Sequence, residues 1–335
     1  MRFLVFAAAA GALIAPSAFA MPAGAQATPA PAATVSADAQ AKARRLYDQA
    51  RGDFKLQRYK DAIGLLDQVV ALDPSAARAY VLRGDSKDEL GDNRAALADY
   101  DAAIAIAPDY AYAYSTRCDT KRELDDLRGA LGDCNKAIAL DATDAQTFEN
   151  KANVELDLGD YTPAVRDYTK AISLDAAFSH PYAGRCAAKR ALGDLDAAIA
   201  DCDQAVKMDP AYPNAFYFRG AVEIDLKRYA DAVVDFTSVL RLSPGHVAAY
   251  YYRGIAHLKN GDLDAALADA NAYVAAVGGD PDGYRLRGEV YAARNDTAKA
   301  VADLTVALNA YRNAGDARAA ATVQQMLDKL GAAKA

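Results

Sequence analysis

Residues 213–246 read PNAFYFRGAVEIDLKRYADAVVDFTSVLRLSPGH, and this 34-residue pattern returns in phase along most of the chain. Its most regular residue is an alanine that recurs every 34 residues without an insertion, at Ala62, Ala96, Ala130, Ala164, Ala198, Ala232, Ala266 and Ala300. A fixed period of this length indicates a stack of small structural units. Such a stack presents a long open surface, so the period favours binding of another macromolecule over chemistry in an enclosed pocket.

Each unit is predicted to form two antiparallel helices. With Ala43 as the first residue of the first unit, positions 4, 8 and 11 and positions 20, 24 and 27 have helical spacing, on either side of a polar, Gly-rich break. Position 4 is aromatic in seven units, position 8 is always small, and Leu occupies position 14 from Leu56 to Leu226. Several units end in proline at position 32, where the second helix must stop because proline cannot donate the next backbone hydrogen bond.

These features resemble the tetratricopeptide repeat family, whose pattern includes the small residue at position 8, the alanine at 20, the aromatic at 24 and a terminal Leu72-Asp73-Pro74. The resemblance implies an all-α, right-handed superhelical solenoid of eight helix-turn-helix units over residues 41–314. Residues 315–331 follow as one more amphipathic helix, expected to cap the array. Local departures are Ala142 and Ala176 in place of proline, the absence of Trp, and a degraded eighth unit.

The N-terminus predicts export. Arg2 precedes an apolar run that ends at Ala15, and Ala18-Phe19-Ala20 fits a small-x-small cleavage site, so residues 1–20 are predicted to be a signal peptide. An uncleaved anchor is the alternative, although the run is too short to span a bilayer. Residues 21–40, rich in Ala and Pro, are predicted to be a disordered tether. The expected location is periplasmic or secreted, of the Gram-negative type, with no membrane span after cleavage.

Composition and motifs argue against several functional classes. The chain has a formal net charge of −7 at pH 7 and no basic stripe, which makes it a poor binder of nucleic acid. Its three histidines are scattered, and H-E-x-x-H, G-x-S-x-G and Walker motifs are absent from the sequence. We therefore predict no catalytic residues, no metal site and no cofactor, and a protein that is not an enzyme.

The four cysteines occupy only two repeat positions, 8 and 24, in the third and fifth units. In an antiparallel hairpin, residues whose position numbers have a constant sum face each other, so positions 8 and 24 should touch. This register predicts two disulfides, Cys118–Cys134 and Cys186–Cys202, in an oxidising compartment. The alternatives are four buried thiols or a metal site with four thiolate ligands, but neither pair has the close ligand spacing of a zinc site.

A matched charge pattern accompanies the cysteines. Units two to eight carry a basic residue at position 7, namely Arg83, Arg117, Lys151, Arg185, Arg219, Arg253 and Arg287. The same units carry Asp at position 23, namely Asp99, Asp133, Asp167, Asp201, Asp235, Asp269 and Asp303. Because the two rows follow each other unit for unit, we predict ion pairs that bridge the two helices of each hairpin. The alternative is an arginine row that grips acidic ligands.

The resemblance also implies where a partner binds, because positions 2, 5, 9, 12 and 13 of each first helix line the concave wall in that family. Carried over, the candidate groove residues are Tyr47, Phe54, Asp85, Asp88, Glu89, Tyr217, Ile224, Tyr251, Ile255 and Leu258. The later ones predict an exposed apolar stripe, which is typical of a partner site. Alternatively, the terminal helix or the tether folds over it.

Together these features predict a non-catalytic protein–protein interaction scaffold or adaptor of the cell envelope that binds a peptide or protein segment in its concave groove. The alternative is a ligand- or carbohydrate-associated envelope assembly factor that stacks sugars on its aromatic residues. The identity of the partner and the oligomeric state are not encoded in any recognisable motif.

Overall fold

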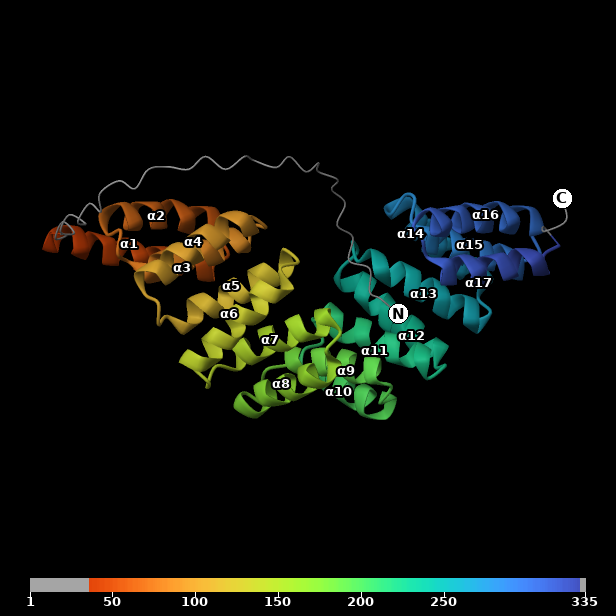
Figure 1. The fold of residues 1–335 in the computed structure, drawn as a ribbon, viewed down its shortest axis with the longest axis horizontal. Helices are drawn as coiled ribbons and strands as arrows, with labels where there is room; N and C mark the ends of the chain where they lie inside the picture. The colour runs from red at the N-terminus through yellow and green to blue at the C-terminus, as the bar shows by residue number, and fades with distance from the viewer. Residues whose placement is uncertain (1–35, 332–335) are drawn as a thin grey trace, which may run out of the picture.

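The computed structural model describes residues 36–331, and within this range the chain forms seventeen helices and no strand (Figure 1). The predicted signal peptide and residues 21–35 of the predicted tether lie outside the described residues. The helices are α1 (Ala37–Lys55), α2 (Tyr59–Leu72), α3 (Ala77–Asp88), α4 (Asn93–Ile106), α5 (Ala111–Glu123), α6 (Leu127–Leu140), α7 (Ala145–Leu158), α8 (Tyr161–Leu174), α9 (His180–Leu192), α10 (Leu195–Met208), α11 (Pro213–Asp225), α12 (Tyr229–Leu242), α13 (Val247–Asn260), α14 (Leu263–Ala276), α15 (Pro281–Ala293), α16 (Thr297–Asn313) and α17 (Ala317–Lys329).

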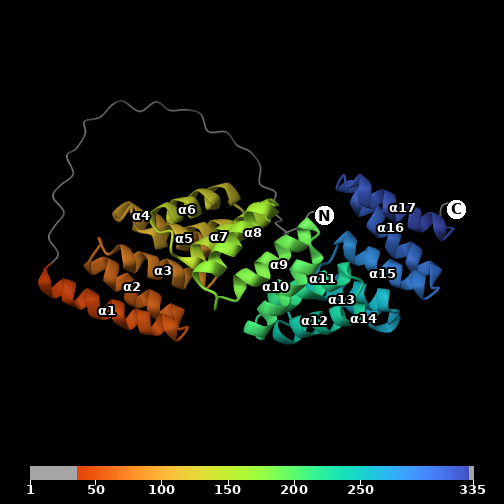
Figure 2. The same cartoon turned by 90° about the horizontal axis from the view of Figure 1, so that it is seen from below.

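The helices pair into eight consecutive hairpins, from α1/α2 to α15/α16, and α17 packs on α16. The predicted all-α array of eight helix-turn-helix units with one further helix is thus confirmed. Figure 1 shows the stack curving into an arch, and Figure 2 shows from below that the hairpins follow one another in chain order. Among residues 36–331, no helix is both long and apolar enough to cross a membrane.

The first helix begins earlier than the sequence analysis placed it. Residues 37–40 were assigned to the tether, yet α1 starts at Ala37. The hydroxyl oxygen of Ser36 accepts a hydrogen bond of 3.2 Å from the backbone N–H of Ala39, which is an ordinary N-cap contact. A serine before an alanine-rich run was therefore the signal for the boundary.

Small residues let the two helices of each hairpin approach closely. The alanine at position 20 is fully buried in every unit. At Gly84, an added Cβ would lie 2.5 Å from Cε1 of Tyr100, a separation that atoms do not tolerate without movement. The small residue at position 8 and the aromatic residue at position 24 thus pack directly against each other. A larger residue at position 8 would separate the helices.

The turn inside every hairpin adopts one backbone shape. Position 15 has a left-handed conformation in all eight units, with glycine in four of them and Gln57, Asp125, Lys227 and Asn295 in the others. A left-handed residue that carries a Cβ costs on the order of 1 kcal/mol relative to glycine. The stacking of the helices therefore imposes the turn even where the local sequence does not favour it.

The first helix of each unit lies on the inner side of the curve. First helices of successive units contact one another along the array, whereas no pair of second helices is among the closely packed pairs in residues 36–331. The inner face is therefore built from α1, α3, α5, α7, α9, α11, α13 and α15, and the candidate groove residues all lie on these helices.

Candidate functional site

The predicted ion pairs form in all seven units. In unit six, the Arg219 Nε atom lies 2.7 Å from Asp235 Oδ2 and the Nη2 atom lies 2.8 Å from Oδ1, which is a bidentate contact. The other five arginines at position 7 make the same contact, and Lys151 Nζ lies 2.7 Å from Asp167 Oδ2. The prediction of an ion pair that bridges each hairpin is confirmed.

Each arginine also links its unit to the preceding one, a contact that the repeat pattern did not predict. Arg219 Nη1 donates a hydrogen bond of 2.9 Å to Asp203 of the previous hairpin, and its guanidinium carbon lies 5.7 Å from the centre of the Phe216 ring. Equivalent acceptors occupy position 25 of the preceding unit for the other arginines, namely Asp67, Asp101, Thr169, Thr237 and Asn271. The guanidinium groups are thus fully engaged inside the array, which argues against a row that grips acidic ligands.

The ion pairs between positions 7 and 23 form a ladder along the array, and the residue at position 11 lies beside each pair. In three units a lysine there binds the same aspartate, as Lys87 does with Asp99 at 2.8 Å. Units four and six carry a buried glutamate there instead, Glu155 and Glu223, each with one carboxyl oxygen that has no partner, and Glu223 lies close to Asp235. Burial, and then the negative charge of Asp235, raise the pKa of Glu223 to about 8. Glu223 is therefore mostly protonated in the folded protein at neutral pH.

Glu223→Gln is expected to stabilise the protein at pH 8, because an amide cannot ionise beside Asp235 and can donate a hydrogen bond to it. A hydrogen bond to a charged group is worth about 1–3 kcal/mol. A glutamate in the unfolded chain has a pKa of about 4.3, so between this pH and about 8 the folded state binds more protons than the unfolded state. Stability therefore falls as the pH rises through this window. The advantage of Glu223→Gln, measured by urea unfolding, should shrink towards pH 5.

Glu223→Lys should stabilise the protein as well, because the ammonium group would face Asp235 as Lys87 faces Asp99. Glu89→Gln makes the same substitution at an exposed position and serves as the control. An equal shift in Glu89→Gln, or a pH-independent shift in Glu223→Gln, would show that the buried carboxyl pair is not the cause.

The structure brings the predicted cysteine partners together. Across the α5/α6 hairpin, the sulfur atoms of Cys118 and Cys134 lie at disulfide bonding distance, and their Cα atoms are 5.4 Å apart. Cys186 and Cys202 are placed in the same way across α9/α10, with Cα atoms 5.5 Å apart. All four side chains are fully buried. Within residues 36–331, no group of three or more His, Cys, Asp or Glu side chains is placed to hold a metal ion.

The inner face of unit two is acidic, but two of its three predicted carboxylates are partly buried. Asp85 accepts hydrogen bonds from the hydroxyls of Tyr100 (2.9 Å) and Tyr112 (3.3 Å), and Asp88 accepts one from Thr120 (3.0 Å). Burial raises the pKa of Asp85 to about 7 and that of Asp88 to about 6. At neutral pH Asp85 thus carries only part of a full charge.

The acidic surface continues further along the array than the sequence analysis placed it. Arg122 on α5 lies 3.0 Å from Asp119 and 3.2 Å from Asp157 on α7, so one arginine joins carboxylates of two units. Burial also raises the pKa of Glu149 on α7 to about 7. These residues occupy positions 5, 9, 12 and 13, the same register that selected Asp85 and Asp88, and applying it to units three and four would have found them.

At the N-terminal end, Tyr47 and Phe54 are half-buried on α1. Tyr47 lines an open pocket of about 640 Å³ together with Arg44, Arg78 and Tyr110. Phe54 packs edge-on against the ring of Tyr59 on α2, with ring centres 5.4 Å apart. Tyr47 thus lines this hollow, whereas Phe54 does not.

The predicted apolar stripe is less exposed than expected. None of Tyr217, Ile224, Tyr251, Ile255 and Leu258 is an exposed residue. The Tyr217 ring packs edge-on against Tyr252, with centres 5.6 Å apart, and the Tyr251 hydroxyl accepts a hydrogen bond from Arg285 of the next unit. The stack itself covers these side chains, because each first helix packs beside the next one.

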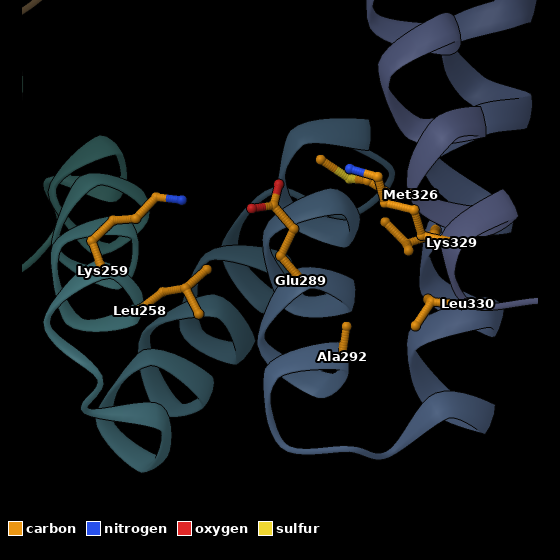
Figure 3. A pocket seen from close by; sticks show the side chains of 8 residues that line it. Leu258, Lys259, Glu289, Ala292, Met326, Lys329 and Leu330 are labelled. Atoms are coloured by element: carbon orange, nitrogen blue, oxygen red, sulfur yellow. The ribbon is translucent and has the colours of Figure 1, made fainter.

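One hollow remains open at the C-terminal end of the inner face. It has a volume of about 350 Å³ and lies between α13, α15 and α17 (Figure 3). Its lining residues are Leu258, Lys259, Glu289, Ala292, Leu304, Met326, Lys329 and Leu330. Leu258 is thus the only one of the five stripe residues that lines it.

A family model described as Tetratricopeptide repeat matches residues 47–113, 149–213, 187–237 and 225–281, which together make up more than half of the chain. The chain belongs to the tetratricopeptide repeat family. No curated protein sequence matches it significantly.

Solved structures show the same fold for this tetratricopeptide repeat protein. A crystal structure of the APC/C hetero-tetramer Cut9–Hcn1 aligns with a TM-score of 0.69 and 18% identity over 84% of this chain and 55% of that chain. This chain therefore spans about half the length of that neighbour. A tetratricopeptide repeat protein from Parabacteroides merdae aligns with a TM-score of 0.54 and 18% identity over 76% of this chain and 98% of that chain.

Proposed function

We propose that this tetratricopeptide repeat protein is a non-catalytic scaffold or adaptor of the cell envelope that binds a peptide or protein segment along its inner face. The observation that carries the proposal is that the inner face changes along the array from acidic to apolar. Carboxylates of Asp85, Asp88, Asp119 and Asp157 gather on α3, α5 and α7, whereas the C-terminal end offers an apolar hollow. Such a graded surface suits an extended segment with a basic part and an apolar part.

The envelope location is supported by two independent features of the chain. Residues 1–20 have the pattern of a signal peptide. Both cysteine pairs lie at bonding distance inside hairpins, and we propose that they form disulfides there, as is typical of an oxidising compartment. The sugar-stacking alternative is less favoured, because Tyr217 and Tyr251 pack against neighbouring side chains instead of presenting open faces.

The test is recovery of partners from the envelope fraction by the mature chain. Glu123, the last residue of α5, is exposed at position 13, the same groove position as Glu89. Replacing Asp88, Glu89 and Glu123 by their amides should lower recovery about tenfold at low salt, because surface carboxylates steer a basic partner. The matched control replaces three exposed carboxylates of second helices, Asp61, Asp196 and Asp231, by asparagine. The control should recover partners as the wild type does. Equal recovery by both triple variants would remove the groove from the function.

A further inference from the structure

The hollow at the C-terminal end is a continuation of the groove, made by α17. Leu258, Ala292 and Met326 are 34 residues apart and occupy position 12 of successive units, so α17 stands where the first helix of a ninth unit would stand. The small side chain of Ala292 lies between two long ones, and this difference in size leaves the hollow open (Figure 3). The terminal helix therefore adds a wall to the inner face besides ending the stack.

The rim of this hollow is basic. Lys259 and Lys329 line it from opposite sides, on α13 and α17, and neither makes an ion pair within residues 36–331. Glu289, the one carboxylate in the lining, is neutralised by Arg285 at 2.7 Å. Arg122 and Arg190, further along the inner face, are by contrast paired with carboxylates. The two free ammonium groups leave the hollow with a net positive rim around an apolar floor.

We propose that this hollow binds one aliphatic or aromatic side chain of a peptide whose next residues carry carboxylates. The apolar side chain would fill the space above Ala292, between Leu258 and Met326, and the carboxylates would pair with Lys259 and Lys329. The volume of about 350 Å³ is at the lower end of the range of ligand pockets, so it has room for one large apolar side chain and part of the peptide beside it. The inference rests on the proposed function and specifies the partner and its direction: its acidic-apolar part lies at α17 and its basic part at α3.

The test selects a displayed library of random dodecapeptides on the mature chain and measures the enriched peptides by fluorescence anisotropy. We expect an apolar residue next to Asp or Glu in the enriched peptides. Ala292→Leu, which fills the hollow, and Lys259→Glu/Lys329→Glu should each weaken binding at least tenfold. A peptide with Lys in place of its acidic residues should regain affinity for the double variant but not for Ala292→Leu.

Matched controls keep the outcomes distinct. Ala298→Leu and Lys136→Glu/Lys207→Glu make the same changes at exposed positions on second helices and should bind as the wild type does. Circular dichroism must show unchanged melting for each variant. If the enriched peptides bind Ala292→Leu normally but lose affinity with the Asp88, Glu89 and Glu123 amides, this inference fails and the proposed function stands. If no peptide is enriched on the wild type, both fail.

Two further measurements test whether something other than an acidic-apolar peptide occupies the hollow. Deletion of residues 21–35 that raises peptide affinity would assign the hollow to the chain's own N-terminal segment. A dimer in light scattering that Ala292→Leu converts to a monomer would assign it to a second copy of the chain. Either result would overturn the proposal of an acidic-apolar peptide.

Discussion

Replacing Arg219 by alanine is expected to lower the free energy of unfolding by about 3–5 kcal/mol, because it leaves a buried carboxylate without its cation. Asp235 is 2% exposed and receives two hydrogen bonds from Arg219. The substitution also removes the link to Asp203 of the preceding unit and the stacking on Phe216. Urea unfolding followed by circular dichroism measures the change.

Glu223 beside Asp235 makes the stability of this site depend on pH, as Glu155 beside Asp167 does in unit four. Without Arg219, the second carboxyl beside Asp235 would be the nearest ionisable neighbour. The two groups would then have to share a proton, as neighbouring carboxyls do. The loss of stability in Arg219→Ala should consequently be smaller near pH 5 than at pH 8, where the pair has to ionise.

Three variants separate the ion pair from its surroundings. Arg241→Ala changes an exposed residue of α12 and should alter stability by less than about 0.5 kcal/mol. Arg219→Lys should fall between the wild type and Arg219→Ala, since an ammonium group cannot make the bidentate contact. If Arg219→Ala unfolds like the wild type but binds partners more weakly, the ladder serves ligand binding and the structural interpretation is wrong.

The fold could be predicted from the sequence because each unit has to pack two helices against each other with the same contacts. Ala232 and its equivalents must be small where two helices touch, and the 34-residue interval makes their common role visible. The ion pairs were also predictable, because two rows that follow each other unit for unit point to a contact. The hydrogen bonds to position 25 were not predictable, because the acceptor residues there, such as Asp203 and Thr237, differ in type.

The inner face was harder to predict, because its exposure depends on the distance between neighbouring units. Register alone places Tyr251 on the inner side, but only the packed structure shows that Arg285 of the next unit covers its hydroxyl. The same limit applies to Asp85, whose pKa burial raises to about 7 although the hydroxyls of Tyr100 and Tyr112 donate hydrogen bonds to it. Helix register predicts which side chains point to the inner face. How much of each side chain is exposed depends on its contacts with the neighbouring unit.

Loss of both cysteine cross-links is expected to lower the free energy of unfolding by about 3 kcal/mol for each pair. Each cross-link would close a loop with a sequence separation of 16, and the chain-entropy model assigns about this value to a loop of that size. Because units three and five each hold one pair, unfolding in urea with a reductant should begin in the middle of the array. Hydrogen exchange of α5/α6 and α9/α10 with and without reductant measures this directly.

A paired substitution separates the cross-link from the packing that surrounds it. Cys118→Gly/Cys134→Tyr copies the Gly84–Tyr100 contact of unit two, so the hairpin keeps a filled interface without a covalent bond. In this variant, reductant should lower the hydrogen-exchange protection of α9/α10, which keeps Cys186–Cys202, but should leave that of α5/α6 unchanged. In the wild type, reductant should lower the protection of both hairpins. Four alkylatable thiols in protein taken from its native compartment would contradict the disulfides. Because a solenoid unit contacts only its neighbours, the loss in the variant should be confined to α5/α6 and the hairpins beside it, leaving α13 to α17 protected.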